Sequence, residues 1–199
     1  RGNTRLVSDW SSDVCSSDLD KDLRLISLTP VVSKVIESFV HHWMWCVVKD
    51  KIDKGQYGAI KGSCTTFALL QMVHEWLSST DDSRHKYFVQ VILLDYAKAF
   101  DHVNPNILME KLAALDIPSF LLRWIESFLS ERYQRVKVGQ TYSEWREIWG
   151  TVPQGTLIGV LCFLIMINDL ECRTIKYVYD TTIYHITSDA NDSRSEERL

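Results

Sequence analysis

The stretch Leu93-Leu94-Asp95-Tyr96-Ala97-Lys98-Ala99-Phe100-Asp101 decides how the rest of this sequence is interpreted. It completes a run from Tyr87 to Leu94 that is rich in Val, Ile and Leu and has the length of a strand. A run of this composition predicts a buried β-strand. The strand ends on Asp95, so a carboxylate is expected at the edge of a sheet.

A second informative acid, Asp180, follows much later in the chain. The segments 175–178 and 182–186 predict a tight hairpin with Tyr179-Asp180-Thr181 at its tip. If this hairpin joins the sheet that contains Asp95, the two carboxylates converge, and converging carboxylates are typical ligands of Mg²⁺ in phosphoryl transfer. The alternative is that both acids only face solvent at the ends of strands.

Helical and strand patterns interleave on both sides of this stretch, which predicts an α+β fold. Apolar residues recur at helical spacing from Val31 to Val47 and from Phe67 to Leu77, so we expect both stripes to pack in the core. Helices are predicted at residues 30–47, 67–77, 104–115, 118–128 and 156–170, and a hairpin is predicted to join residues 132–138 to 142–149.

Composition limits the class of protein. The chain has 199 residues, of which 46% are hydrophobic and 24% charged, as in ordinary globular proteins. Five cysteines without a Cys-x-x-Cys pair argue against a disulfide framework or a zinc site. No apolar run reaches the roughly 20 residues of a membrane span, and no apolar signal segment opens the chain. We therefore expect an intracellular protein (cytoplasm or nucleus) without a membrane partner.

The two ends differ from the rest of the sequence. Residues 1–20 repeat Ser-Ser-Asp and resemble a translated sequencing adapter or an acidic linker, so they are predicted to lie outside the fold. Residues 188–199 are polar and predict a disordered tail. The net charge of −4 is unfavourable for a protein that binds a polyanion, but residues 21–187 hold equal numbers of acidic and basic side chains.

Five sequence blocks follow one another between Asp20 and Ile186. Together, and in this order, they resemble the reverse transcriptase (RNA-directed DNA polymerase) domain of non-LTR, LINE-type retrotransposons. The blocks are Leu23-Arg24-Leu25-Ile26-Ser27-Leu28-Thr29-Pro30; Gln56-Tyr57-Gly58 with Thr65-Thr66; Leu93 to Asp101; Val152-Pro153-Gln154-Gly155-Thr156-Leu157 with Ile167-Asn168-Asp169-Leu170; and Tyr177-Val178-Tyr179-Asp180.

The resemblance implies a polymerase right-hand fold made of fingers and palm, with the thumb absent. The fingers would comprise residues 21–85 and 117–150, and the palm residues 86–116 and 151–187. It also implies partners, namely an RNA template, a DNA primer and deoxynucleoside triphosphates; no protein partner is evident. Asp95 and Asp180 would be catalytic and would hold two Mg²⁺ ions, which activate the primer 3′-hydroxyl and carry the triphosphate.

The resemblance also implies a set of nucleotide-binding residues. Phe100 would occupy the space that a ribose 2′-hydroxyl needs, although packing in the core is the alternative. Gln154 and Gly155 would lie beside the incoming nucleotide and the template, Tyr96 would belong to the same site, and Arg24 would contact the triphosphate.

One departure from the family pattern bears on activity. The family motif is aromatic-x-Asp-Asp, and Tyr179 stands where the first Asp belongs. A phenol is neutral at physiological pH and larger than a carboxylate, so it cannot supply the missing metal ligand. We therefore expect a degenerate, truncated and inactive reverse transcriptase.

Two other functions remain open. The chain could be a non-catalytic nucleic-acid-binding module in which basic side chains contact phosphates, unless these charges form only a solvated face. It could also be a hydrolase with Asp95 as the nucleophile, although no partner motif supports this. The basic side chains are Lys49, Lys51, Lys54, Lys61, Arg132, Arg135 and Lys137.

Overall fold

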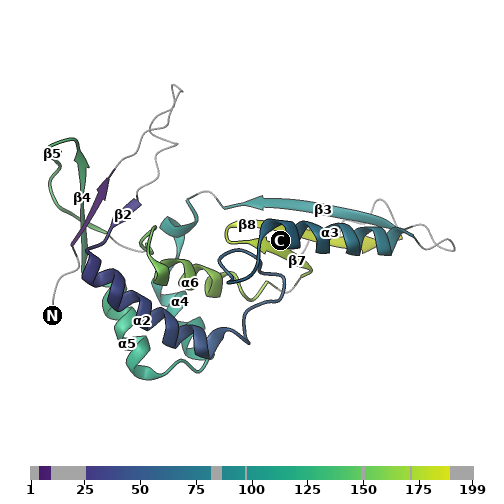
Figure 1. Cartoon of the computed structure of the whole chain (residues 1–199), viewed down its shortest axis with the longest axis horizontal. Helices are drawn as coiled ribbons and strands as arrows, with labels where there is room; N and C mark the ends of the chain where they lie inside the picture. Colours follow the sequence, from purple (N-terminus) through teal and green to yellow (C-terminus); the bar gives the residue numbers. More distant parts are fainter. Residues whose placement is uncertain are drawn as a thin grey trace. The chain divides into compact units, whose positions relative to one another are not determined.

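The computed structural model describes residues 5–9, 26–81, 87–96, 98–148, 151–170 and 172–188. The chain forms two compact units, each built from two segments that are distant in sequence. The first unit comprises residues 1–51 and 98–166, and the second comprises residues 52–97 and 167–199. Both units combine helical structure with a β-sheet, which confirms the predicted α+β class (Figure 1).

The sheet of the first unit is centred on β4. Strand β4 (Arg132–Val138) pairs antiparallel with β5 (Thr141–Tyr142) and β6 (Arg146–Ile148), as the alternating sequence predicted. On its other side β4 pairs in parallel with β1 (Arg5–Asp9), which pairs antiparallel with β2 (Ile26–Leu28).

Strand β1 corrects one prediction. Residues 1–20 were expected to lie outside the fold, but Arg5–Asp9 pairs residue by residue with Tyr133 to Lys137 of β4. The sequence pattern missed this strand because a backbone ladder satisfies main-chain N–H and C=O groups whatever the side-chain periodicity. The other residues of 1–20, and residues 189–199 of the predicted tail, lie outside the described residues.

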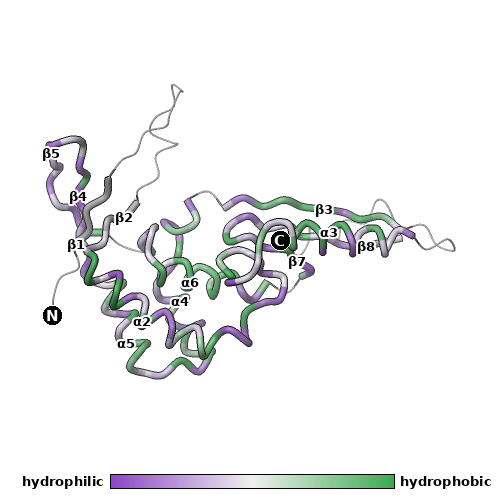
Figure 2. Tube along the Cα trace, viewed as in Figure 1, coloured by the Kyte–Doolittle hydropathy of each residue, from purple (hydrophilic) through white to green (hydrophobic). Residues whose placement is uncertain are grey.

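Helix α6 (Leu157–Met166) forms the core of the first unit. Its sequence, LIGVLCFLIM, is apolar throughout (Figure 2), and most of its residues are buried. It contacts α2 (Val31–Val48) and α4 (Pro105–Ala114), and α4 contacts α5 (Ser119–Leu129). Helix α6 ends four residues before the predicted Leu170 because residues 167–169 form a turn.

The short helix η1 (Ala99–His102) also contacts α6. In the part of the chain that the structure describes, none of the helices has both the length and the apolar character needed to cross a membrane.

The second unit is a three-stranded antiparallel sheet with one long helix. The strand order is β3 (Phe88–Asp95), β8 (Asp180–Thr187) and β7 (Thr174–Tyr177), and α3 (Thr65–Thr80) packs against the sheet (Figure 1). A buried cluster of Ala68, Ile175 and Tyr184 joins α3 to β7 and β8, and Trp76 stacks edge-on against Tyr184 with ring centroids 6.1 Å apart.

The two apolar helix stripes are not core stripes, contrary to the prediction. In α2 the buried apolar residues are Val40, Met44 and Val48, which lie four positions apart on one narrow face. In α3 the buried residue is Ala68. The exposed apolar side chains are Val31, Val32, Val35, Ile36, Phe39 and Trp43 of α2, and Phe67, Leu69, Leu70, Val73 and Leu77 of α3.

Strand β3 is also less buried than its composition predicted. Its residues alternate between half-buried and exposed from Gln90 onward, and Leu93 is 77% exposed. A run of Val, Ile and Leu is typical of a strand covered on both faces, whereas this strand is the edge of its sheet.

Candidate active site

The two carboxylates of the predicted site lie opposite one another. Strands β3 and β8 pair over eight positions, from Phe88 with Thr187 to Asp95 with Asp180. Residues that lie directly opposite in an antiparallel pair project from the same face of the sheet. Both Asp95 and Asp180 are exposed. The register therefore brings two accessible carboxylates together at one end of the sheet.

The hairpin that carries Asp180 turns slightly earlier than predicted. Strand β7 ends at Tyr177, Val178 and Tyr179 form the turn, and Asp180 is the first residue of β8 rather than the tip. Val178 has φ of 60°, a left-handed conformation that β-branched residues rarely adopt. The half-buried Tyr179 thus lies in the turn, next to the Asp95–Asp180 pair.

Asp95 and Asp180 would suit one Mg²⁺ ion better than two. Mg²⁺ is commonly bound by one or two carboxylates with substrate phosphates and water completing the octahedron, so these two residues could hold a single ion. A pair of ions needs further anionic oxygen, and the adjacent position holds the Tyr179 phenol. Across the described ranges of the chain, no group of three or more His, Cys, Asp or Glu residues is arranged to hold a metal.

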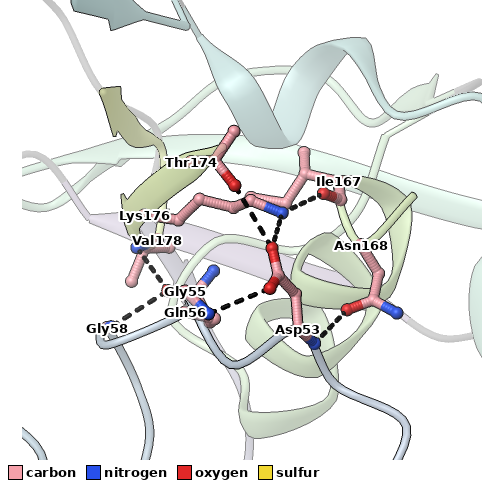
Figure 3. Close-up of polar contacts among 9 residues, drawn as sticks. All are labelled: Asp53, Gly55, Gln56, Gly58, Ile167, Asn168, Thr174, Lys176 and Val178. Atoms are coloured by element: carbon pink, nitrogen blue, oxygen red, sulfur yellow. Dashed lines mark hydrogen bonds and ion pairs between the residues drawn. The ribbon is translucent and has the colours of Figure 1, made fainter. Parts of the chain in front are cut away.

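A partly buried ion pair joins the loop at residues 53–58 to strand β7 of the hairpin (Figure 3). The Lys176 side chain is 1% exposed, and its Nζ lies 2.6 Å from Oδ2 of Asp53 and donates to the Ile167 carbonyl at 3.0 Å. Oδ2 of Asp53 also accepts from the Thr174 hydroxyl, and Oδ1 from the Gly55 amide. Burial raises the pKa of the Asp53 carboxyl, but these hydrogen bonds outweigh it and hold the pKa below its ordinary 3.8.

Gln56 connects the loop at residues 53–58 to the turn of the hairpin. Its side-chain Oε1 accepts from the backbone N–H of Gly58 at 2.9 Å and of Val178 at 3.2 Å (Figure 3). Backbone hydrogen bonds from Tyr57 to Lys176 and from Lys176 to Gly55 pair the loop with β7.

Sequence reasoning assigned no role to this loop. Gln56-Tyr57-Gly58 entered only as part of the family resemblance, and Asp53 and Lys176 were not singled out at all. No local pattern distinguishes them, because an isolated Lys or Asp in a sequence is most often exposed. Their contacts join positions more than 100 residues apart.

Phe100 lies in the first unit and packs as a core side chain. The residue is 9% exposed, and its ring lies against Phe163 of α6, with centroids 5.3 Å apart. This burial agrees with the alternative interpretation of Phe100, and its role beside a nucleotide stays a prediction. In the second unit, Tyr96 is half-buried directly after β3. Arg24 lies outside the described residues.

Gln154 and Gly155 form the turn before α6. The Gln154 carbonyl accepts from the Ser27 amide at 2.9 Å, and Gly155 has φ of 92°, which favours glycine. The Thr156 hydroxyl accepts from the Gly159 amide at 3.0 Å and so caps the first turn of α6. These residues therefore form the turn that leads into helix α6. Their contact with a nucleotide stays a prediction.

The predicted phosphate-binding residues do not form one set. Arg132 is buried, its guanidinium donates to the Thr151 carbonyl, and burial lowers its pKa to about 10, so the prediction that it contacts phosphate is wrong. Arg135 instead lies over the rings of Tyr142 and Trp145, 4.0 and 4.7 Å from their centroids. Lys51 pairs with Asp116. Of the remaining lysines, Lys49, Lys54 and Lys61 are exposed and Lys137 is half-buried.

Comparison with known families decides the identity of the domain. Residues 16–189 match the family model described as "Reverse transcriptase (RNA-dependent DNA polymerase)". The chain belongs to this reverse transcriptase family.

Curated relatives are transposon polymerases of Drosophila melanogaster. The reverse transcriptase domain is 26% identical over 159 residues to the probable RNA-directed DNA polymerase from transposon BS, covering 79% of this chain and 17% of that protein. It is 28% identical over 180 residues to the RNA-directed DNA polymerase from mobile element jockey, covering 89% of this chain and 19% of that protein. The matches confirm the reverse transcriptase domain of a LINE-type element. The chain spans less than a fifth of these relatives' length.

Solved structures confirm the polymerase fold. The reverse transcriptase domain is similar to the telomerase of Candida albicans, solved with a TWJ fragment of telomeric RNA, with a TM-score of 0.69 and 10% identity over 98% of this chain and 38% of that one. It is also similar to the apo telomerase of Candida tropicalis, with a TM-score of 0.60 and 12% identity. That match covers 88% of this chain and 43% of the telomerase chain. The two compact units have other boundaries than the predicted fingers and palm, which remain a prediction.

Proposed function

We propose that this reverse transcriptase domain binds an RNA template, a DNA primer and deoxynucleoside triphosphates, and that with Tyr179 in place it does not catalyse nucleotide transfer. The observation that carries this proposal is the register of β3 and β8, which places Asp95 opposite Asp180 with Tyr179 beside them. The site has two carboxylates, Asp95 and Asp180, that could bind a metal-bound triphosphate. It lacks the third carboxylate, which the family motif has at position 179.

The chemistry explains why the third group matters. Mg²⁺, when bound, supplies positive charge that lowers the barrier to displacement at the triphosphate. Asp95 and Asp180 would hold that charge at the end of the sheet and orient it by their opposite positions on β3 and β8. Tyr179 offers a phenol in place of a carboxylate, and losing a carboxylate at such a site is expected to reduce the rate roughly 10³-fold or more.

Primer extension with Mg²⁺ and deoxynucleotides tests the proposal. We compare the unaltered chain, Tyr179→Asp, and Tyr179→Asp fused to a thumb from a related element. The fused variant is expected to extend the primer, and adding Asp180→Asn to it should abolish extension. The proposal is wrong if the unaltered chain extends the primer at a rate near that of the fused, restored one.

A second function, non-catalytic binding of single-stranded nucleic acid, is favoured by the aromatic and basic side chains of the β4–β5 hairpin. Arg135 stacks on Tyr142 and Trp145, Tyr142 is 45% exposed, and Lys137 lies 5.9 Å from the Tyr142 ring. Stacking of bases on aromatic rings beside basic groups is typical of such binding. Titrating the same proteins with labelled primer–template tests it. The second function is favoured if the chain binds the primer–template in a salt-dependent way and still does not extend the primer after Tyr179→Asp and fusion to the thumb.

A further inference from the structure

We propose that Gln56 and Gly58 are positioning residues that fix the β7–β8 turn and thereby hold Asp180 opposite Asp95. The inference rests on the proposed function only in its last step, that the placement of Asp180 matters for metal and nucleotide binding. All the residues involved belong to the second unit.

The turn itself is a strained connection. It contains two residues, Val178 and Tyr179, and the favoured two-residue turns require positive φ, which Asn, Asp and Gly adopt most easily. Val178 adopts φ of 60° despite its branched Cβ. Such a conformation persists only when the surroundings hold it in place. The Val178 amide donates to Oε1 of Gln56, so the Gln56 side chain is placed to hold it.

Gly58 lets the loop approach the turn closely. A Cβ at position 58 would lie 2.4 Å from the Val178 nitrogen and 2.6 Å from the Tyr177 carbonyl carbon, which are backbone atoms that cannot move unless the whole turn shifts. Any larger residue would therefore push the turn away from the loop. Because the Gly58 amide donates to the same Gln56 oxygen, that one acceptor holds the loop and the turn together.

The loop is itself anchored to β7. The Asp53–Lys176 ion pair and the bonds of Asp53 with Gly55, Thr174 and Asn168 tie its first residues to the strand and to the segment before it (Figure 3). A Cβ at Gly55 would lie 2.2 Å from the Thr174 carbonyl oxygen, so this contact is also a close one. Gln56 therefore projects from a fixed base, which a positioning side chain requires.

Hydrogen exchange and residual dipolar couplings of the ¹⁵N-labelled full chain test the proposal. Gln56→Leu removes the acceptor at similar size, Gln56→Glu keeps an oxygen there, and Gln71→Leu is the matched control on α3, where Gln71 bonds Glu75. We expect Gln56→Leu to accelerate exchange of the Val178 and Gly58 amides about tenfold, with Ile183 on β8 unchanged. Gln56→Glu should retain protection, and Gly58→Ala should shift the couplings of the Asp180 amide.

Three results would overturn the proposal. One is equal exchange at Val178 in Gln56→Leu and in the Gln71→Leu control. Another is faster exchange at Val178 with unchanged couplings at Asp180 in both Gln56→Leu and Gly58→Ala, which would make the contact merely structural. Uniform loss of protection that includes Ile183, in both Gln56→Leu and Gln56→Glu, would count against it in the same way.

A metal titration separates this inference from the proposed function. In the Tyr179→Asp background, Mn²⁺ is added as a paramagnetic probe, and broadening of the Asp95 and Asp180 amide signals is followed. Adding Gln56→Leu should weaken Mn²⁺ binding about tenfold relative to adding Gln71→Leu. If Tyr179→Asp binds no Mn²⁺, the proposed function fails, whereas the exchange and coupling measurements still decide the positioning of the turn.

Discussion

Lys176 illustrates how a single residue is constrained by its surroundings. Its side chain is 1% exposed, and its charge is balanced by Asp53, whose side chain is 29% exposed. The Lys176 Nζ also donates a hydrogen bond to the Ile167 carbonyl. A buried ion pair of this kind adds little net stability over a hydrophobic pair, but removing one partner leaves the other charge uncompensated.

We therefore predict that Lys176→Met destabilises the second unit by about 2–4 kcal/mol, somewhat less than for a fully buried pair because water still reaches Asp53. Urea denaturation at pH 7 measures the effect. Lys49→Met, which removes an exposed lysine, is the control and should change stability by less than about 0.5 kcal/mol.

The pH dependence adds a second readout of this substitution. The pKa of Asp53 is held below its ordinary 3.8, so its stabilising contribution is present above pH 3.8 and is lost as the pH falls through the folded-state pKa. In Lys176→Met the strongest partner is gone, so this acid-dependent loss should shrink. An unchanged slope of stability below pH 3.8 would contradict the role given to the pair.

At the scale of elements, Glu37 links α2 to the start of α6. Its side chain is 2% exposed and accepts from the Leu157 amide, the first of α6, while its Oε1 has no partner among the described residues. Burial raises the pKa of Glu37 above its ordinary 4.5, against the opposing effects of the Leu157 amide and of Lys34. The protonated form is therefore favoured in the folded state, and that contribution is fully present below pH 4.5 and lost as the pH rises through the folded-state pKa.

From this we predict opposite effects of two substitutions. Glu37→Gln keeps an acceptor for the Leu157 amide without the charge, so it should be at least as stable as the unaltered chain at pH 7, with the difference vanishing toward pH 4.5. Glu37→Ala removes the acceptor and should be about 1 kcal/mol less stable than Glu37→Gln. Thermal unfolding between pH 4 and 8 measures both effects. If the Glu37→Gln protein is less stable than the Glu37→Ala protein at pH 7, residue 37 does not act as the acceptor for the Leu157 amide.

The elements were predictable from sequence where local signals define them. Asn104 and Pro105 predict the start of α4. In the structure the Asn104 side-chain oxygen caps the helix by accepting a hydrogen bond from the Asn106 amide. The buried faces were not predictable, because an apolar stripe indicates a helix but not its neighbours. Helix α2 buries Val40 and Met44 and exposes Val31 and Phe39, although all four are apolar.

In the candidate site, too, features with a local sequence signal were predictable and features that depend on distant residues were not. The juxtaposition of Asp95 and Asp180 was predictable, because Asp95 ends a strand-like run, Asp180 lies where a hairpin turns, and pairing of the two strands brings these positions together. The loop that supports the hairpin was not, because Gln56 meets Val178 across 122 positions of sequence. The hydrogen bond from buried Arg132 to the Thr151 carbonyl was likewise not predictable, because no local pattern in β4 points to Thr151.

At the scale of the whole molecule, the decisive feature is that each unit is assembled from two separate segments. The sheet of the second unit depends on this, because β3 comes from residues 52–97 whereas β7 and β8 come from residues 167–199. Neither segment holds a complete hydrophobic cluster, since Ala68 is in one and Ile175 and Tyr184 are in the other.

Ending the chain after Met166 should therefore unfold what remains of the second unit and leave the first unit folded. Helix α3 would lose Ile175 and Tyr184, and a 16-residue helix without tertiary packing is only marginally stable in water. Both segments of the first unit, with the α6 core, stay present. Hydrogen exchange followed by mass spectrometry should show protection lost over residues 65–95 and kept over α6, whereas a chain ending at Ser188 keeps both. Equal protection of α3 in the two shortened chains would contradict this dependence of α3 on the second segment.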